Sequence, residues 1–136
     1  MRYALPLAAT ALALQACQQR PPAATGTRMF QADLLGAAKN CSVPEVAPAA
    51  GQEAPVTMKV GNDGGWCAIT VDNSGKPFDA GLLVTEPAHG KVYIHSVGDK
   101  TRIDYTPGAR FTGTDAFAVR LLPGGAVLRA SVTVDQ

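Results

Sequence analysis

The stretch FAVRLLPGGAVLRASVTV, residues 117–134, decides the fold of this 136-residue chain. Apolar and polar side chains alternate along Phe117–Leu121 and again along Leu128–Val134. An alternation of period two is typical of strands that turn one face to a core, and Pro-Gly-Gly between two such runs is typical of a turn. The stretch therefore predicts two strands joined by a turn.

The same alternation recurs upstream and predicts five further strands. Their apolar faces are Val56, Met58 and Val60; Cys67, Ile69 and Val71; Leu82 and Val84; Val92 and Ile94; and Ile103 and Tyr105. Asn62–Gly65 predicts a turn and Asp72–Gly81 a loop. Because no helical segment separates these strands, about seven of them predict an all-β fold, an antiparallel immunoglobulin-like β-sandwich over residues 44–136.

Residues 29–43 form an N-terminal extension to this sandwich. Phe30, Leu34 and Leu35 stand at near-helical spacing within Met29–Lys39, which predicts a short helix or turn. Residues 42–54 are rich in proline and alanine, which predicts a loop or an irregular edge strand.

The N-terminus carries the tetrapeptide Leu14-Gln15-Ala16-Cys17 after a short apolar run. That run is too short to span a bilayer and has the length of a signal-peptide core. The tetrapeptide resembles the lipobox of bacterial lipoprotein signal peptides. The resemblance implies that residues 1–16 are removed, that Cys17 is the lipid attachment site, and that residues 17–28 are a flexible tether. The alternative is an ordinary secretory leader in which Cys17 is incidental.

By the same resemblance, Gln18 after the cysteine favours the outer membrane, so we expect a cell-envelope protein that faces the periplasm or the cell surface. Once Cys17 is assigned to lipid, Cys41 and Cys67 remain as a pair, and an oxidising compartment predicts a disulfide between them. A redox or metal-binding thiol pair is the alternative, although neither cysteine has a CxxC partner or a histidine nearby.

The charges of the chain nearly balance, with 12 Lys+Arg and 11 Asp+Glu. This balance argues against nucleic acid as a partner and against a polybasic membrane patch. The attachment to the membrane is therefore expected to come from the lipid.

The C-terminal half contains Pro87–Val92, Tyr105–Pro107, Phe111–Phe117 and Ala130–Val134 in an order that resembles bacterial immunoglobulin-like, cadherin-like domains. Such domains occur as tandem repeats in large surface adhesins, so the resemblance implies a sandwich with a role in adhesion or interaction. The present chain has one copy and an added cysteine pair. Its aspartates are scattered singly, whereas calcium needs six to eight converging oxygens, so calcium is not expected. Calcium-stabilised adhesion stays open as a third option.

Several motif residues have predicted structural roles. Gly90 is expected to supply a backbone conformation that other residues disfavour. The ring of Tyr105 is expected in the core with its hydroxyl at the rim. Thr112–Asp115 is expected to be a turn in which Asp115 accepts backbone hydrogen bonds.

The sequence offers no recognisable catalytic set. It contains no G-x-S-x-G elbow, no paired carboxylates and no phosphate-binding glycine loop. His89 and His95 alone would make a weak metal site, because one belongs to a turn and the other to an outer strand face. We therefore expect no enzymatic activity, no cofactor and no metal.

Three residues are candidates for binding: Trp66, Tyr93 and His95. Trp66 either serves as an exposed contact anchor or packs under the extension that Cys41 brings across. The expected function is that of a non-enzymatic, lipid-anchored envelope protein that interacts with an unknown envelope protein or polymer. The alternative is an envelope inhibitor, for example of lysozyme or a protease, or a small-ligand binder. Its candidate projections are the loop Asp72–Gly81 and the turn at Gly124-Gly125.

Overall fold

A computed structural model describes residues 30–136; the predicted signal peptide (1–16), Cys17 and the tether (17–28) lie outside this range. The elements are a 3-10 helix η1 (Gln31–Leu34) and the strands β1 (Cys41–Ser42), β2 (Glu53–Gly61), β3 (Cys67–Val71), β4 (Ala80–Thr85), β5 (Gly90–Val97), β6 (Lys100–Pro107), β7 (Gly113–Leu122) and β8 (Ala126–Asp135). The short helix falls where the near-helical spacing predicts it.

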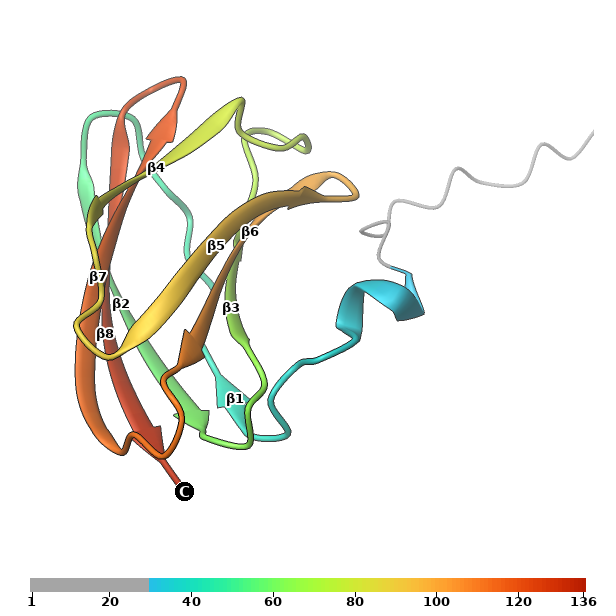
Figure 1. Ribbon diagram of the computed structural model, residues 1–136. Coiled ribbons are helices and arrows are strands. Elements are labelled where there is room, and N and C mark those ends of the chain that lie inside the picture. The colour runs from blue at the N-terminus through green and yellow to red at the C-terminus, as the bar shows by residue number, and fades with distance from the viewer. Residues whose placement is uncertain (1–29) are drawn as a thin grey trace, which may run out of the picture.

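Two sheets pack face to face (Figure 1). One has the order β1-β2-β8-β7-β4 and the other the order β3-β6-β5. All pairings are antiparallel except that of β2 with β8, which is parallel. The predicted all-β sandwich is confirmed, and β2–β8 are the seven predicted strands in the immunoglobulin arrangement of sheets. The two-residue β1, inside the predicted extension, is an eighth.

The alternating apolar positions form the core, as predicted. Fully buried side chains come from both sheets, and the largest are Tyr105, Phe117, Met58, Ile69, Ile103, Leu121 and Leu128. The inward faces of β2, β3, β6, β7 and β8 follow the predicted register at every buried position named above. Period-two burial of this kind fixes the register, because a slip of one residue would turn each apolar face to solvent.

The predicted apolar face of β4 is wrong. Leu82 and Val84 are 47% and 45% exposed, whereas Leu83 between them packs against the core. β4 is an edge strand, and its pairing with β7 shifts register between Leu83 and Thr85. The inward position next to Leu83 is taken by Gly81, where any side chain would collide with Ile94.

Three expectations about the C-terminal motif also need correction. Gly90 has no left-handed backbone; an added Cβ would lie 2.3 Å from the ring of Tyr105, so close approach is what requires glycine. The segment Thr112–Asp115 is not a turn, because β7 already begins at Gly113. The hydroxyl of Tyr105 is not at the rim, and it donates a buried hydrogen bond to Asp115 at 2.9 Å.

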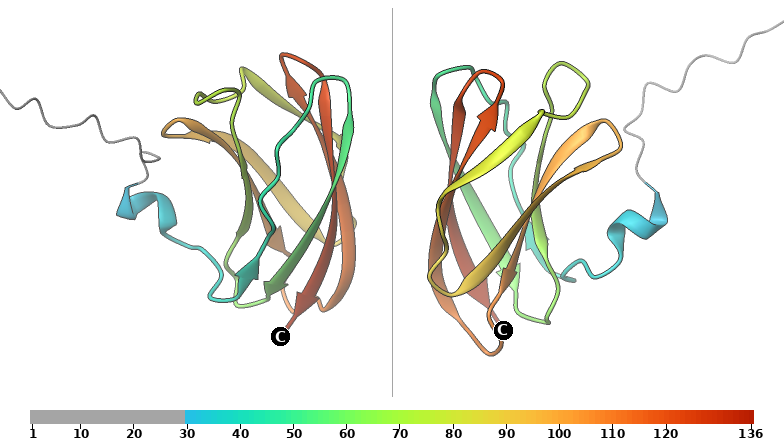
Figure 2. Two further views of the ribbon diagram at one scale, coloured as in Figure 1. Left: turned by 180° about the vertical axis from the view of Figure 1, so that it is seen from behind. Right: turned by 45° about the horizontal axis from the view of Figure 1, so that its top comes forward.

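The helix η1 of the extension lies on the side of the three-stranded sheet, whereas β1 at the end of the extension belongs to the five-stranded sheet (Figures 1 and 2). The N–H of Phe30 donates to the carboxylate of Asp33 at 2.8 Å, which closes the first turn of η1. From η1 the chain descends to β1, where it joins the edge of the five-stranded sheet beside β2.

Candidate functional site

Trp66 marks one end of a line of side chains across the outer face of the β3-β6-β5 sheet. It packs against the extension: its N–H donates to Gly36 at 3.0 Å, its carbonyl accepts from Ala38 at 2.8 Å, and its indole Nε1 donates to Leu35 at 3.0 Å. This geometry agrees with the interpretation that Trp66 packs under the extension. The alternative of a freely exposed contact anchor is wrong, because the side chain is half-buried and its N–H is occupied.

Arg102 lies over Trp66 and carries the line onto the central strand β6. Its guanidinium carbon is 4.0 Å from the indole centroid, which is a cation–π contact. The same guanidinium also donates to the carbonyl of Asp33 in η1. Arg102 therefore links the extension to the outer face of the three-stranded sheet, next to Trp66.

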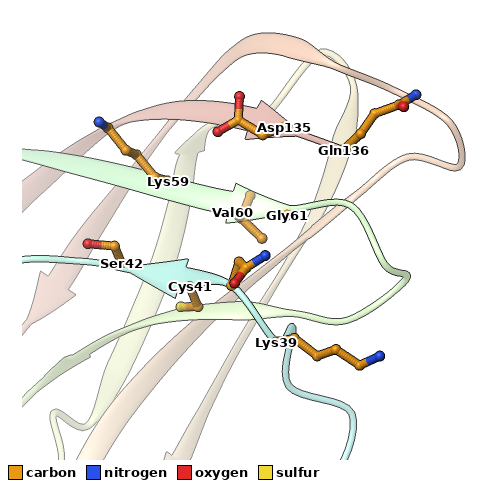
Figure 3. A pocket seen from close by; sticks show the side chains of 9 residues that line it. Lys39, Cys41, Ser42, Lys59, Val60, Gly61, Asp135 and Gln136 are labelled. Atoms are coloured by element: carbon orange, nitrogen blue, oxygen red, sulfur yellow. The ribbon is translucent and has the colours of Figure 1, made fainter.

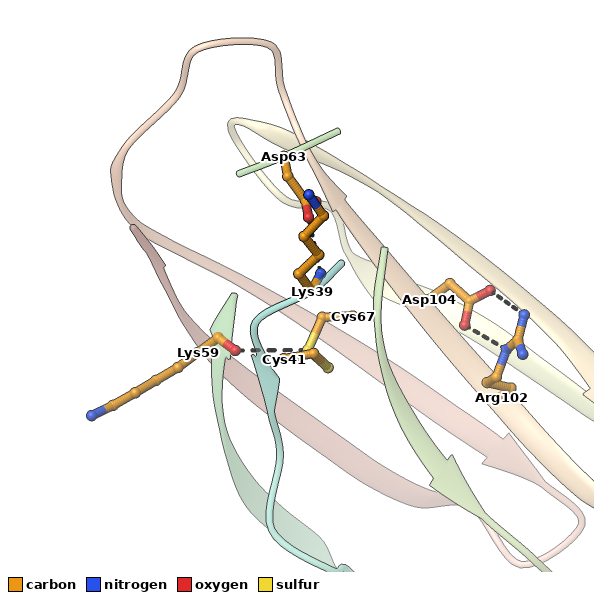
Figure 4. The surroundings of a disulfide bond; sticks show 7 residues. All are labelled: Lys39, Cys41, Lys59, Asp63, Cys67, Arg102 and Asp104. Carbon is orange, nitrogen blue, oxygen red and sulfur yellow. Dashed lines mark hydrogen bonds and ion pairs between the residues drawn. A yellow bond between two sulfur atoms is a disulfide. The ribbon is translucent and has the colours of Figure 1, made fainter. Parts of the chain in front are cut away.

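Asp104 pairs with this guanidinium in a two-point contact (Figure 4). Nε of Arg102 is 2.8 Å from one carboxylate oxygen, and Nη2 is 3.0 Å from the other. Arg102 and Asp104 are only 6% and 5% exposed, although they alternate with the core residues of β6 and belong to its outer face. Charged side chains are rarely buried unless they are paired, and here the two charges pair with each other while Asp33 of the extension and Trp66 contact Arg102.

His95 and Tyr93 complete the line on the edge strand β5. Nε2 of His95 is 3.0 Å from the carboxylate of Asp104, and in the sheet His95 is opposite Arg102 while Tyr93 is opposite Asp104. The rings of Tyr93 and His95 lie 4.6 Å apart between centroids, and Tyr93 is 65% exposed. The line thus runs from a half-buried tryptophan, through a buried ion pair, to an exposed aromatic ring.

The structure brings all three predicted binding candidates to this one face. We call the line Trp66, Arg102, Asp104, His95 and Tyr93 the outer-face network. Sequence reasoning missed its two central members, Arg102 and Asp104, which alternate with the core residues Ile103 and Tyr105 on β6. The available signal was an arginine and an aspartate two residues apart on one face of a strand, a spacing at which they can pair.

His89 lies apart from this network and does not join His95 in a site. Its ring stacks on Phe111 at 4.2 Å between centroids, while His95 contacts Asp104. Within residues 30–136 no group of three or more His, Cys, Asp or Glu side chains is placed to hold a metal ion. None of the helices in that range is long and apolar enough to cross a membrane.

Asp115 organises the turn between β4 and β5. It accepts hydrogen bonds from the N–H groups of Ala88, His89 and Ala116 and from the hydroxyl of Tyr105. Burial alone would raise the pKa of Asp115, but these four donors outweigh it and the pKa is lowered. Burial and the neighbouring carboxylate raise the pKa of Tyr105, so its hydroxyl remains a donor. The prediction that Asp115 accepts backbone hydrogen bonds is confirmed, and this role is structural.

The disulfide between Cys41 and Cys67 is present and joins the two sheets (Figure 4). It links β1 of the five-stranded sheet to β3 of the three-stranded sheet, with Cα atoms 5.3 Å apart. Beside it is a groove of about 380 Å³ between β1, β2 and the C-terminal residues. Lys39 and Lys59 flank this groove and point away from each other (Figure 3), so they do not converge on a ligand.

A second hollow, of about 330 Å³, lies at the opposite end of the sandwich. It is lined by Asp72, Asn73, Ser74 and Phe78 of the β3–β4 loop, by Pro123, Gly124 and Ala126 of the β7–β8 turn, and by Pro48 and Ala50. The structure therefore brings together the two segments that the sequence indicates as candidate projections.

Comparison with known proteins adds no name to these features. No protein-family model matches the chain, and no curated protein matches its sequence.

Proposed function

We propose that the chain is a non-enzymatic, lipid-anchored protein of the bacterial cell envelope whose outer-face network binds an envelope protein or polymer. The single observation that carries the binding part is the exposed ring of Tyr93 at the end of a buried, charge-paired network. The resemblance of Leu14–Cys17 to a lipobox carries the anchoring part.

The network suits binding because its exposed end is held in place before a partner arrives. Asp104 fixes the ring of His95, and His95 in turn contacts the ring of Tyr93. Tyrosine offers a large contact surface with few rotatable bonds, so little conformational entropy is lost on binding. Lys91 is exposed on the same strand, two residues before Tyr93, and it adds a positive charge beside the ring.

The cysteine pairing supports the proposed location. Disulfides persist in oxidising compartments such as the bacterial periplasm, and two of the three cysteines are bonded to each other. This pairing leaves Cys17 as the one cysteine that a lipid could occupy.

The binding role can be tested by photo-crosslinking in intact envelopes. A photoreactive phenylalanine analogue placed at position 93 should capture a specific partner, and the same analogue at Leu82, which is also exposed but on the other sheet, should not. Tyr93→Ala should weaken recovery of that partner, whereas Leu82→Ala should leave it unchanged. Equal capture from both positions, or hydrolysis of envelope polymers by the purified protein, contradicts the proposal.

The anchoring role has its own direct measurement, which is mass spectrometry of the mature N-terminus. We expect cleavage before Cys17 and a mass increase from acyl chains on that residue. Cleavage at another position, or an unmodified Cys17, rules out the anchor without affecting the crosslinking result.

A second candidate function, inhibition of lysozyme or a protease, is favoured by the loop-lined hollow. An inhibitory surface needs projecting loops that lie side by side, and the β3–β4 loop and the β7–β8 turn do so around one cavity. Asp72 of that loop is tied to Lys100, which limits the motion of the rim. This function predicts that Asn73→Ala lowers inhibition of purified lysozyme while Tyr93→Ala does not. The absence of any inhibition by the unaltered protein would exclude it for that enzyme.

A further inference from the structure

The extension exposes a compact set of apolar side chains. Phe30, Leu34 and Leu35 are 71%, 50% and 75% exposed, and together they are half of the large apolar side chains that are exposed within residues 30–136. We call these three residues the extension patch. Single exposed apolar residues are ordinary, but three on one short helical turn need an explanation.

The extension patch is not free to fold back onto the domain. The backbone of the extension is held against the sheet by Arg102, which donates to Asp33, and by Trp66, which donates to Leu35. Trp66 and Arg102 thus contact the extension from the domain, and the side chains of Phe30, Leu34 and Leu35 remain exposed.

We propose that the extension patch docks into the surface of the lipid bilayer that carries the anchor. This inference rests on the proposed lipid attachment at Cys17. Its occupant is the membrane itself, because the chain leads directly from the patch to the lipidated residue.

The length of chain between Cys17 and Phe30 supports this occupant. Twelve residues lie between the two positions, so Phe30 cannot lie more than roughly 45 Å from the lipid attachment point. A tether of this length keeps the patch at a high effective concentration near the bilayer. Even a weak apolar contact is then occupied for much of the time.

The chemistry of the patch also fits a bilayer surface. Phenylalanine and leucine are the side chains that amphipathic segments bury at the boundary between headgroups and acyl chains. Asp33 is the acidic residue of η1, and its carboxylate already accepts the N–H of Phe30. The acyl chains on Cys17 would hold the chain at the membrane, and the patch would add a second contact that fixes the orientation of the domain.

The experiment uses the only tryptophan of the chain, Trp66, which lies under the extension. The chain from Cys17 onward contains all of the described fold, and Cys17 is its one thiol outside the disulfide. Cys17 is coupled to a maleimide lipid in phosphatidylcholine vesicles that also contain a dansyl-labelled lipid. Energy transfer from Trp66 to dansyl then reports how close the extension lies to the bilayer.

We expect strong transfer for the unaltered chain and at least about a twofold loss for Phe30→Ser/Leu34→Ser/Leu35→Ser, because the tether alone permits much larger separations. The matched control, Leu82→Ser/Val84→Ser, removes exposed apolar side chains from another edge and should leave transfer unchanged. Tryptophan emission of each variant without vesicles checks that the extension stays in place.

Three results would overturn the inference. The first is equal transfer for the unaltered chain and the triple variant. The second is transfer that rises with protein density and vanishes at low density, which assigns the patch to a second copy of the chain. The third is transfer that requires anionic lipid, which would show that the extension approaches the bilayer by charge attraction and not by apolar contact. Because the lipid is attached chemically, none of these results depends on whether Cys17 is lipidated in the cell.

Discussion

At the scale of single residues, Arg102 connects more parts of the molecule than any other side chain described above. It stacks on Trp66, pairs with Asp104 and donates to the backbone of η1. A buried ion pair adds little stability compared with a well-packed apolar pair, but removal of one partner leaves a buried charge uncompensated. The cost of mutation should therefore exceed the net contribution of the pair.

Arg102→Ala is expected to lower the free energy of unfolding by about 3 kcal/mol, because Asp104 would remain buried without the guanidinium and with only His95 as a partner. Arg102→Lys should restore only part of the loss, since an ammonium group cannot make the two-point contact with the carboxylate. Urea titration followed by Trp66 fluorescence measures both. Lys91→Ala, at an exposed position on β5, is the control and should change stability by less than about 0.5 kcal/mol. A similarly small effect of Arg102→Ala would contradict the description of this pair as buried and coupled.

The lowered pKa of Asp115 predicts how the free energy of unfolding changes at acidic pH. Its pKa in the folded state is lowered from the ordinary value of 3.8, so its contribution is present above that value and is lost as the pH falls through the folded pKa. Asp115→Asn should therefore be less stable than the unaltered protein at neutral pH, and the two should converge in strong acid. Thermal unfolding at a series of pH values from neutral to about 2 measures the difference. A difference that stays constant over the whole range would contradict this assignment.

The sequence could predict which residues face the core far better than which polar residues are buried. Val56, Ile69 and Val132 are buried as the alternation predicts, since one face of each strand must be apolar. The burial of Arg102 depends on its contacts with Asp33 of the extension and with Trp66, and Asp104 is enclosed by Arg102 and His95. These contacts are tertiary, so no local sequence pattern predicts them.

At the scale of elements, the extension and β1 depend on the disulfide more than on strand pairing. β1 contributes only two residue pairs to β2, at Cys41 and Ser42. The bond to Cys67 closes a sequence separation of 26 residues and places the extension beside Trp66. In the chain-entropy model, a loop of this size is stabilised by roughly 3 kcal/mol.

Cys41→Ala/Cys67→Ala should therefore lower the free energy of unfolding by roughly 3 kcal/mol, and reduction of the unaltered protein should have a similar effect. Hydrogen exchange should show where the loss occurs. The amides of Ala38 and Trp66 form the hydrogen bonds between the extension and the start of β3, and they should exchange faster. Amides in the β7–β8 pairing should keep their protection from exchange under conditions in which the protein does not unfold globally. Uniform loss of protection across both sheets would show that the bond does not act locally.

For β4 the sequence predicts that a strand forms but not which of its side chains point to the core. Leu82, Leu83 and Val84 are all apolar, so the sequence gives no alternation from which to choose a face. The choice is made by tertiary packing, in which Leu83 fills the core and Gly81 leaves room for Ile94. Edge strands with mixed exposure are where pattern reasoning is weakest.

At the scale of the whole molecule, the parallel pairing of β2 with β8 completes the five-stranded sheet. It runs in continuous register from Glu53 opposite Val127 to Gly61 opposite Asp135. Four members of the contiguous hydrophobic core cluster lie on β8, at Leu128, Ala130, Val132 and Val134. The last strand is therefore both the centre of one sheet and a large part of the core.

Deletion of residues 126–136 is expected to abolish cooperative unfolding, because both β2 and β7 lose their longest partner. Deletion of residues 30–37 is the comparison, since that segment lies outside the core and Cys41 remains. The second variant should keep the circular dichroism of a β-sandwich and a cooperative melt. A folded first variant, or an unfolded second one, would contradict the division into core and extension.

The pairing of β2 with β8 also has a consequence for how the protein folds during synthesis. A polypeptide that emerges N-terminus first presents β2 early, and β2 must wait for residues 126–135 before its main partner exists. Non-local pairing of this kind slows folding and exposes unfinished chains to proteases. A chain that lacks residues 126–135 therefore leaves the main hydrogen-bonding edge of β2 unpaired, and it should be degraded faster than a chain that contains them.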